Sequence, residues 1–136
     1  MTPDGQTIFF DLLGDIYSVP VGGGTAKRVT SGMAFDSQAV VSPDGKRLAF
    51  ISDREGSDNL WIADLDGANA RQLSKEEQGD FLSPSWMPGG DYVLVSKATP
   101  SSGAHEIWMY HVQGGAGALV TKSKARPDQP RDQWLN

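Results

Sequence analysis

The stretch Ser42-Pro43-Asp44-Gly45-Lys46-Arg47-Leu48-Ala49-Phe50 decides the fold of this chain, because weaker copies of the same pattern stand before and after it. Each copy is a turn followed directly by a short apolar run. The proline presets φ at the second position of the turn, and the next two residues tolerate the bridge and left-handed conformations that complete it. The turns consist of Pro3, Asp4 and Gly5, then of Pro43, Asp44 and Gly45, and finally of Pro88, Gly89 and Gly90.

These turns recur at the spacing of a structural repeat. From Pro3 to Pro43 is 40 residues, and from Pro43 to Pro88 is 45. A second signature keeps the same order, since each unit has an aromatic residue near the start of a later apolar run: Tyr17, Trp61 and Trp108. A period of roughly 40 to 45 residues with several short strands in each unit is typical of a β-propeller blade. The sequence therefore predicts an all-β fold, a β-propeller of four-stranded antiparallel blades with three blades in this chain.

The apolar patterns predict where the blades lie. In the middle unit we expect strands at about residues 38–41, 47–52, 59–65 and 71–74, and in the third unit at about 83–86, 92–97, 106–111 and 118–121. Residues 1–136 thus form one propeller segment: blade 1 at about 1–34, blade 2 at about 35–79, blade 3 at about 80–122, and a tail at 123–136. The first turn stands at the N-terminus, so we expect blade 1 to lack its first strand.

Composition excludes several classes of function. No run of residues approaches the roughly 18 to 20 apolar positions that a membrane helix requires, so we expect no membrane span. The chain begins with no basic stretch followed by an apolar segment, so it shows no export signal, and without Cys its compartment stays unknown. The formal net charge is −5 and the Lys and Arg residues are scattered singly, which argues against nucleic acid as a partner.

A catalytic site is not apparent in the sequence. His105 and His111 lie six residues apart across a strand, roughly 20 Å at about 3.3 Å per residue, so they cannot share a metal ion. The acidic loop at 53–58 does not have the spacing of a calcium-binding loop, and the glycines at 22–24 lack the context of a phosphate-binding loop. We therefore predict no catalytic residue, no metal site and no cofactor. We assign Tyr17, Trp61 and Trp108 to packing between blades.

Three longer stretches carry a family resemblance. The runs at 41–50, 59–67 and 86–90 resemble the repeats of TolB-like propellers, and the resemblance extends from Thr2 to about Thr121. More narrowly, residues 1–35 are similar to the TolB-like region that precedes the hydrolase domain in amidohydrolase-related proteins. The resemblance implies a six- or seven-bladed propeller, often periplasmic, that binds partners or gates a neighbouring catalytic domain. This chain departs from the family because it has three blades and no hydrolase domain.

The end of the chain suggests how a ring could close. Three blades leave two exposed sheet faces, and Gln133, Trp134 and Leu135 resemble the first strand of a blade. If this tail completes blade 1 of a second copy, two chains make six blades of four strands, and the protein is a two-fold homodimer. In the alternative, the tail is disordered and the chain is a piece of a longer propeller.

Two functions follow from these expectations. The first is a non-catalytic scaffold that binds a protein or a small ligand on its loop face or in its central channel. The second is the N-terminal propeller fragment of an amidohydrolase-related enzyme, in which the propeller gates a metal-dependent hydrolase domain that this chain lacks.

Overall fold

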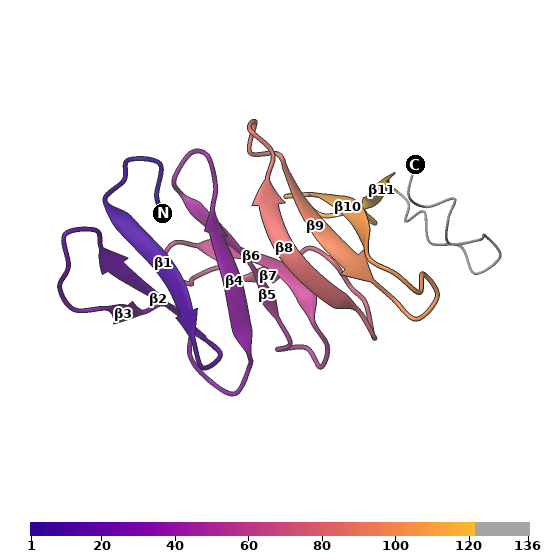
Figure 1. Ribbon diagram of the computed structural model, residues 1–136, viewed down its shortest axis with the longest axis horizontal. Helices are drawn as coiled ribbons and strands as arrows, with labels where there is room; N and C mark the ends of the chain where they lie inside the picture. The colour runs from indigo at the N-terminus through magenta and orange to yellow at the C-terminus, as the bar shows by residue number, and fades with distance from the viewer. Residues whose placement is uncertain (122–136) are drawn as a thin grey trace, which may run out of the picture.

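A computed structural model of the protein describes residues 1–121, and these residues form three antiparallel sheets in chain order (Figure 1). Blade 1 contains β1 (Thr7–Leu12), β2 (Asp15–Pro20) and β3 (Lys27–Arg28). Blade 2 contains β4 (Asp36–Val41), β5 (Arg47–Ser52), β6 (Asn59–Asp64) and β7 (Arg71–Gln72). Blade 3 contains β8 (Asp80–Trp86), β9 (Tyr92–Ala98), β10 (Glu106–His111) and β11 (Ala118–Thr121). The all-β fold of antiparallel, blade-like sheets is therefore confirmed.

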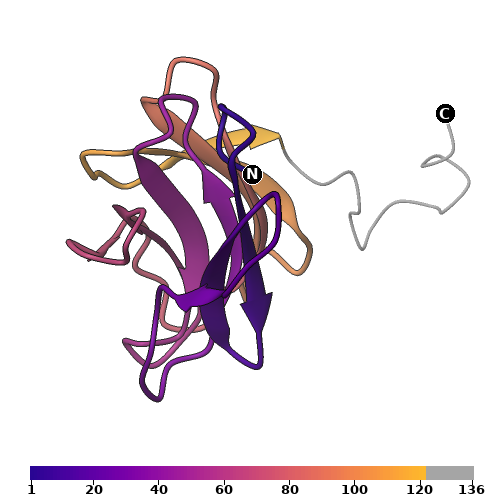
Figure 2. The same ribbon diagram turned by 90° about the vertical axis from the view of Figure 1, so that its left-hand side faces the viewer.

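The three sheets pack face to face in sequence order. β4 contacts β1 on one side and β8 on the other, so β1, β4 and β8 lie side by side (Figure 1). Viewed from the blade 1 side, the sheets follow one behind another (Figure 2). Within residues 1–121, β1 has only β2 as a hydrogen-bonded neighbour in its sheet. The strand that we assigned to Gln133, Trp134 and Leu135 lies outside the described residues.

The proline turns are alike in their backbone bonds. The N–H groups of Gly5, Gly45 and Gly90 each donate to the carbonyl three residues earlier at 2.9 Å, and the three glycines have φ between +72° and +78°. In the middle turn, Asp44 Oδ1 accepts hydrogen bonds from Ser42 Oγ at 2.6 Å and from the Lys46 N–H at 3.0 Å. The third turn has Gly89 in place of the aspartate, so it has no such carboxylate bonds.

The Asp44 carboxylate is expected to make folding depend on pH. Its hydrogen bond with Ser42, followed by the bond from the Lys46 N–H, lowers the pKa of Asp44 below its ordinary value of 3.8. A lowered folded-state pKa contributes stability above the unfolded pKa, and that contribution disappears as pH falls through the folded one. We expect Asp44→Ala to cost about 1 kcal/mol at neutral pH and less below pH 3.8. Urea unfolding across this range checks the prediction, with Asp91→Ala in the third turn as the control.

The first strand of blades 2 and 3 begins earlier than predicted. The sequence pattern placed these strands at residues 38 and 83, whereas β4 begins at Asp36 and β8 at Asp80. The difference arises from a β-bulge in each strand, where Gln38 and Ser83 have positive φ and the alternation of apolar residues breaks. The two bulges also connect the blades, because the Gln38 N–H donates to Asp11 Oδ2 at 2.8 Å and the Ser83 N–H donates to Gln38 Oε1 at 2.7 Å.

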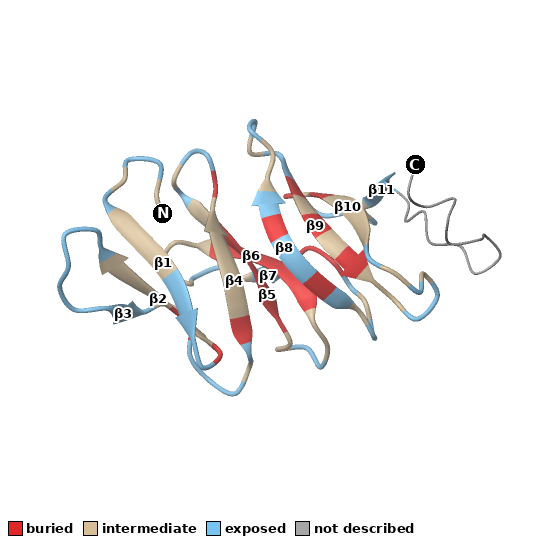
Figure 3. Ribbon diagram, in the orientation of Figure 1, coloured by how far each residue is buried: buried red, intermediate tan, exposed pale blue. Residues whose placement is uncertain are grey.

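The core consists of two apolar clusters, one at each boundary between blades. The cluster between blades 1 and 2 contains Ile16, Leu48, Phe50, Trp61 and Ala63. The cluster between blades 2 and 3 contains Ala49, Ile51, Leu60, Ile62, Leu73, Phe81, Val93, Val95, Tyr110 and Val112. Both faces of blade 2 are therefore covered, and its strands carry much of the buried surface (Figure 3). Within residues 1–121, each outer blade has one face covered by another blade.

The two outer faces of the stack expose apolar side chains. On blade 1, Phe10 and Leu12 are exposed, and Phe10 stacks on Tyr17 with ring centroids 5.6 Å apart. On blade 3, Leu82 and Tyr92 are exposed. We call these surfaces the N-terminal face and the C-terminal face. Residues 1–121 include no helix that is long and apolar enough to cross a membrane.

Candidate functional site

The antiparallel strands sort the connecting segments into two ends of the stack. The proline turns join β4 to β5 and β8 to β9, and they lie along one edge with the first proline turn (Figure 1). We call this edge the turn end. The opposite edge carries the β3–β4 and β7–β8 connections between blades, together with the β1–β2, β5–β6 and β9–β10 loops. We call it the crossover end, and it holds a wide cleft.

This cleft lies between blades 2 and 3 and has a volume of about 1030 Å³. One wall is the β7–β8 connection, and the other is the β9–β10 loop with the adjoining ends of β9 and β10. The lining is mostly polar and consists of Lys75, Glu76, Glu77, Gln78, Lys97, Thr99, Pro100, Ser101, Ser102, Glu106 and Trp108.

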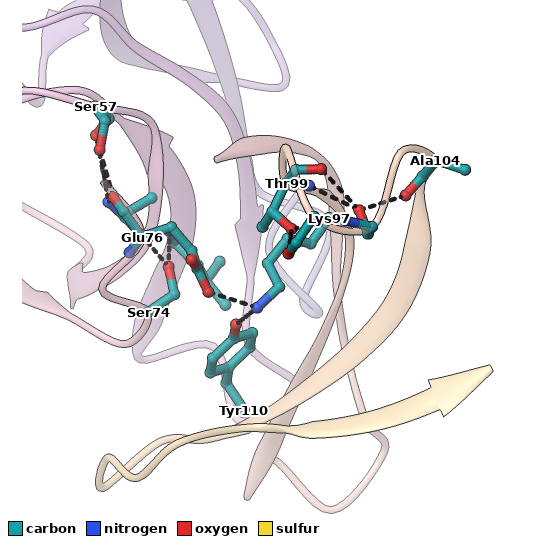
Figure 4. Close-up of polar contacts among 11 residues, drawn as sticks. Ser57, Ser74, Glu76, Lys97, Thr99, Ala104 and Tyr110 are labelled. Atoms are coloured by element: carbon teal, nitrogen blue, oxygen red, sulfur yellow. Dashed lines mark hydrogen bonds and ion pairs between the residues drawn. The ribbon is translucent and has the colours of Figure 1, made fainter. Parts of the chain in front are cut away.

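Lys97 is the central charge at this boundary (Figure 4). Its side chain is buried, and Nζ lies 2.8 Å from Glu76 Oε1 and 2.9 Å from the Tyr110 hydroxyl. The ammonium also lies 3.7 Å from the centroid of the Trp108 ring. Burial by itself would lower the pKa of Lys97, but the hydrogen bonds with Glu76 and Tyr110 outweigh it, so the pKa is raised. Lys97 is therefore the ion-pair partner of Glu76 at this boundary.

The backbone around Glu76 is held by a separate polar network. The side-chain amide of Asn59 donates to the Glu76 carbonyl at 2.9 Å and accepts from the Glu76 N–H at 2.8 Å. Ser74 Oγ donates to Asn59 Oδ1 at 2.8 Å, and Ser57 Oγ donates to the Glu76 carbonyl. Because Asn59 and Ser74 are buried, this network fixes the direction in which Glu76 approaches Lys97.

The three repeated aromatic residues occupy equivalent positions, and each carries a cation over its ring. Arg28 lies 5.7 Å from the centroid of Tyr17, Arg54 lies 5.0 Å from that of Trp61, and Lys97 lies over Trp108. Trp61 belongs to the cluster between blades 1 and 2, and Trp108 packs against the cluster between blades 2 and 3.

Tyr17 differs from the two tryptophans in that no described blade packs against its side chain. Its neighbour Ile16 points into the cluster between blades 1 and 2, and side chains alternate along a strand, so Tyr17 points to the N-terminal face. No described blade covers that face, and the assignment of Tyr17 to packing between blades stays a prediction.

The hydrogen-bond partners of the two histidines were not predicted from the sequence. His105 Nδ1 lies 3.0 Å from Ser96 Oγ, and its Nε2 lies 3.1 Å from Asp80 Oδ2, which gives the order of a Ser–His–Asp relay. However, the Asp80 side chain is 62% exposed, so water competes for its contact with His105. In a working triad the acid is buried and holds the imidazole in one orientation. His111 instead accepts from the Gln113 N–H and packs edge-on against Tyr92.

The acidic β5–β6 loop shows no arrangement for a metal ion. Asp53 Oδ1 accepts from the Phe35 N–H at 2.8 Å, and Arg54 pairs with the buried Asp36 at 2.9 Å. Burial raises the pKa of Asp58, and the nearby charges of Asp53 and Asp80 raise it further. In residues 1–121 no group of three or more His, Asp and Glu side chains is placed to hold a cation.

Comparison with known proteins gives the same fold. Residues 2–131 match the family described as the tricorn protease N-terminal β-propeller domain. The chain is 33% identical over 110 residues to a TolB homolog of Chlorobium luteolum, a match that covers 81% of this chain and 24% of that protein. The structure of a putative TolB from Agrobacterium tumefaciens is similar with a TM-score of 0.75 and 22% identity, over 88% of this chain and 47% of that one.

A hydrolase also has this fold in part. The structure of a puromycin hydrolase is similar with a TM-score of 0.66 and 22% identity, over 89% of this chain but 21% of the hydrolase. The present chain spans about a third or less of the length of the curated relatives that it matches.

Proposed function

This chain belongs to the TolB-like β-propellers, within the family of the tricorn protease N-terminal β-propeller domain, and from that membership we propose that it is a non-catalytic binding module. In this proposal its crossover end binds a protein or small ligand, and the proline turns at the other end have a structural role only.

The state of Lys97 is the observation that supports this function. The cleft between blades 2 and 3 contains the buried cation Lys97, which is already neutralised by Glu76 and hydrogen-bonded to Tyr110. A catalytic lysine needs a lowered pKa, whereas the pKa of Lys97 is raised. In this proposal Glu77 and Glu106, which also line the cleft, contact the bound partner.

The contact of Ser96 with His105 makes the proposal testable. We expect the purified chain to hydrolyse p-nitrophenyl acetate no faster than an exposed histidine does in any folded protein. We also expect Ser96→Ala to leave that rate unchanged, because Asp80 is too exposed to orient the imidazole. Hydrolysis that is lost in Ser96→Ala, while His105→Gln behaves in the same way, would show that the module is an enzyme.

We further propose that the working form is a closed ring of six blades made from two copies of this chain. The N-terminal and C-terminal faces expose apolar side chains that a neighbouring blade would cover. β1 also has a free edge within the described residues, where a strand from Gln133, Trp134 and Leu135 of a second copy would pair. The similar TolB structure is about twice as long as the part that this chain matches, which agrees with half a ring per chain.

Light scattering coupled to size exclusion tests this assembly. We expect twice the chain mass of 14.6 kDa, and a return to the single-chain mass after deletion of residues 133–136. A folded species of single-chain mass in the full chain contradicts the dimer. That result would favour a propeller that is completed by further blades of a longer polypeptide.

A second function is supported by the lengths of the relatives. The matching part is 21% of the puromycin hydrolase and 8% of a peptidase of Bacillus subtilis, so in those proteins this fold is joined to a much longer chain. In this alternative the propeller would gate a hydrolase domain in a longer parent protein, and the amidohydrolase relationship belongs to this proposal. Coding sequence for a hydrolase domain continuous with this chain would support it, and a stop codon after Asn136 would contradict it. A periplasmic location is proposed for either function, from the resemblance to TolB proteins.

A further inference from the structure

The hairpin between β1 and β2 has a leucine in a left-handed conformation, which L residues with bulky side chains rarely adopt. Leu13 has φ of +52° and Gly14 has φ of +88°, so both central residues of this two-residue turn are left-handed. Such a turn favours Asn-Gly, because a leucine side chain is sterically strained in this conformation. Leu13 is nevertheless 92% exposed, so the strain is not offset by burial. A strained and exposed apolar residue at a loop tip indicates a role outside the fold.

Two more exposed apolar residues lie at the same end of the stack. In the β3–β4 connection, Met33 is fully exposed and Phe35 is 56% exposed. The Phe35 ring lies against Gly14, where a Cβ atom would come within 2.9 Å of it, and the Asp36 N–H donates to the Gly14 carbonyl at 2.8 Å. Leu13 and Phe35 therefore belong to one surface, which we call the Leu13 patch together with Met33.

The Leu13 patch is not a surface that ring closure would cover. It lies on loops of the crossover end at the boundary of blades 1 and 2, whereas a neighbouring blade would pack on the sheet face that carries Phe10 and Tyr17. The corresponding loops of blades 2 and 3, at 53–58 and 99–105, are polar. The apolar loop tip is therefore particular to blade 1.

Acidic side chains border the patch. A hollow of about 660 Å³ lies between Met33 and the β5–β6 loop, and Asp53 joins the two by accepting the Phe35 N–H at 2.8 Å. Asp58 and Asp80 continue the acidic surface, and the raised pKa of Asp58, caused by burial and then by its two acidic neighbours, shows that the carboxylates repel one another. Arg54 also lines the hollow, and its guanidinium is paired with the buried carboxylate of Asp36 at 2.9 Å. A bound cationic group would relieve this repulsion.

We propose that the Leu13 patch is the docking surface for a polypeptide segment of a partner protein in which apolar side chains stand next to Lys or Arg. The apolar side chains of the segment would cover Leu13, Met33 and Phe35, and its cations would face Asp53 and Asp58. This inference rests on the proposed binding function, and it names the end of the stack and the chemistry of the partner.

Short synthetic peptides of defined pattern test the docking surface on the full chain. The first peptide alternates Lys with Leu, the second alternates Lys with Ser, and the third alternates Glu with Leu. Binding is measured at physiological ionic strength, where the Debye length is about 8 Å, so that long-range attraction between the cationic peptides and the acidic protein is screened. We expect the Lys/Leu peptide to bind at least about tenfold more tightly than either of the others, since both the apolar and the charged contacts are required.

Leu13→Asn separates the docking role from a structural one. Asparagine suits the left-handed turn, so we expect this variant to unfold at a higher temperature while its affinity for the Lys/Leu peptide falls about tenfold. Met33→Ser is expected to weaken binding without a change in stability, and Met87→Ser, at a half-buried position of the turn end, is the control for a methionine outside the patch. In methyl NMR spectra the Met33 signal should shift on peptide addition while that of Met87 stays in place.

Each contrary result is decisive. Equal binding of the Lys/Ser and Lys/Leu peptides, unchanged binding by Leu13→Asn, or loss of stability in Leu13→Asn would overturn the inference. Failure of the proposed function is a separate outcome, because ester hydrolysis that depends on Ser96 would refute a non-catalytic module whatever the peptides do. A chain that neither hydrolyses esters nor binds the Lys/Leu peptide keeps its proposed function and loses this docking surface.

Discussion

Trp61→Ala is expected to lower the free energy of unfolding by about 3–5 kcal/mol, the cost of truncating a large aromatic side chain in a packed core. The Trp61 side chain is 6% exposed and packs with Ile16 of blade 1 and Phe50 of its own sheet. The substitution also removes the ring that lies against the guanidinium of Arg54. Because blades 1 and 2 meet at this side chain, its loss weakens their contact as well as blade 2 itself. Urea denaturation followed by far-ultraviolet circular dichroism measures the effect.

Tyr17→Ala is the matched control, since Tyr17 occupies the equivalent position on blade 1. In a single chain the Tyr17 side chain packs on Phe10 and Arg28 and has no described blade beyond it, so we expect a cost below about 1.5 kcal/mol. In a closed ring a neighbouring blade would cover Tyr17, and the cost should rise toward that of Trp61→Ala and depend on protein concentration. Equal and small effects of both substitutions would contradict the assignment of Trp61 to packing between blades.

Lys97→Met should destabilise the protein by about 2–3 kcal/mol at neutral pH. Methionine keeps most of the volume, so the variant removes the charge and the hydrogen bonds with Glu76 and Tyr110 but leaves little cavity. Breaking a buried ion pair costs about 3–5 kcal/mol, and we expect less here because the Glu76 side chain is 34% exposed and water takes up part of its charge. The lost contact between the ammonium and the Trp108 ring adds to the cost.

The double variant Lys97→Met with Glu76→Gln isolates the ion pair. Glutamine removes the charge that Lys97→Met leaves without a partner, so we expect the double variant to recover at least about 1 kcal/mol relative to Lys97→Met alone. Additive losses in the two single variants would mean that the Lys97 ammonium stabilises the boundary through its contacts with Tyr110 and Trp108 and not through the pair with Glu76. Thermal unfolding of the four proteins at the same concentration gives the comparison.

Much of the fold could be predicted because its signals are local. The Pro43-Asp44-Gly45 turn specifies its own φ values, and the observed φ of +73° at Gly45 is the left-handed conformation that the turn requires. Strand β5 has the predicted bounds of residues 47–52, because its continuous apolar run, buried on both faces of the sheet, stands between a proline turn and a polar loop. Strand β4 was predicted too short, because the bulge at Gln38 interrupts the alternation, and the Gln38 N–H is bonded to Asp11 in another blade.

The contacts of the candidate site could not be predicted in the same way. Glu76 and Lys97 are 21 residues apart, and His105 and Asp80 are 25 residues apart. Their contacts depend on how the sheets stack and on the side to which each loop turns. No pattern in the sequence of either segment indicates which distant residue it will contact. A signal for Leu13 was present, since a leucine before a glycine in a two-residue hairpin is unfavourable, but it has meaning only once the turn is known to be left-handed.

Sequence alone determined the repeat, the order of the strands and the positions of the turns, because these depend on backbone preferences and on apolar periods that act over a few residues. Only the tertiary structure decided which cation lies over which aromatic ring, that Lys97 is neutralised by Glu76, and that Leu13 and Phe35 share one surface at the crossover end. The cation–ring pairs lie within single blades, whereas the Glu76–Lys97 pair and the Leu13–Phe35 surface join segments that are distant in the sequence. The energies of all these contacts depend on burial and on distance, which are set when the sheets pack together.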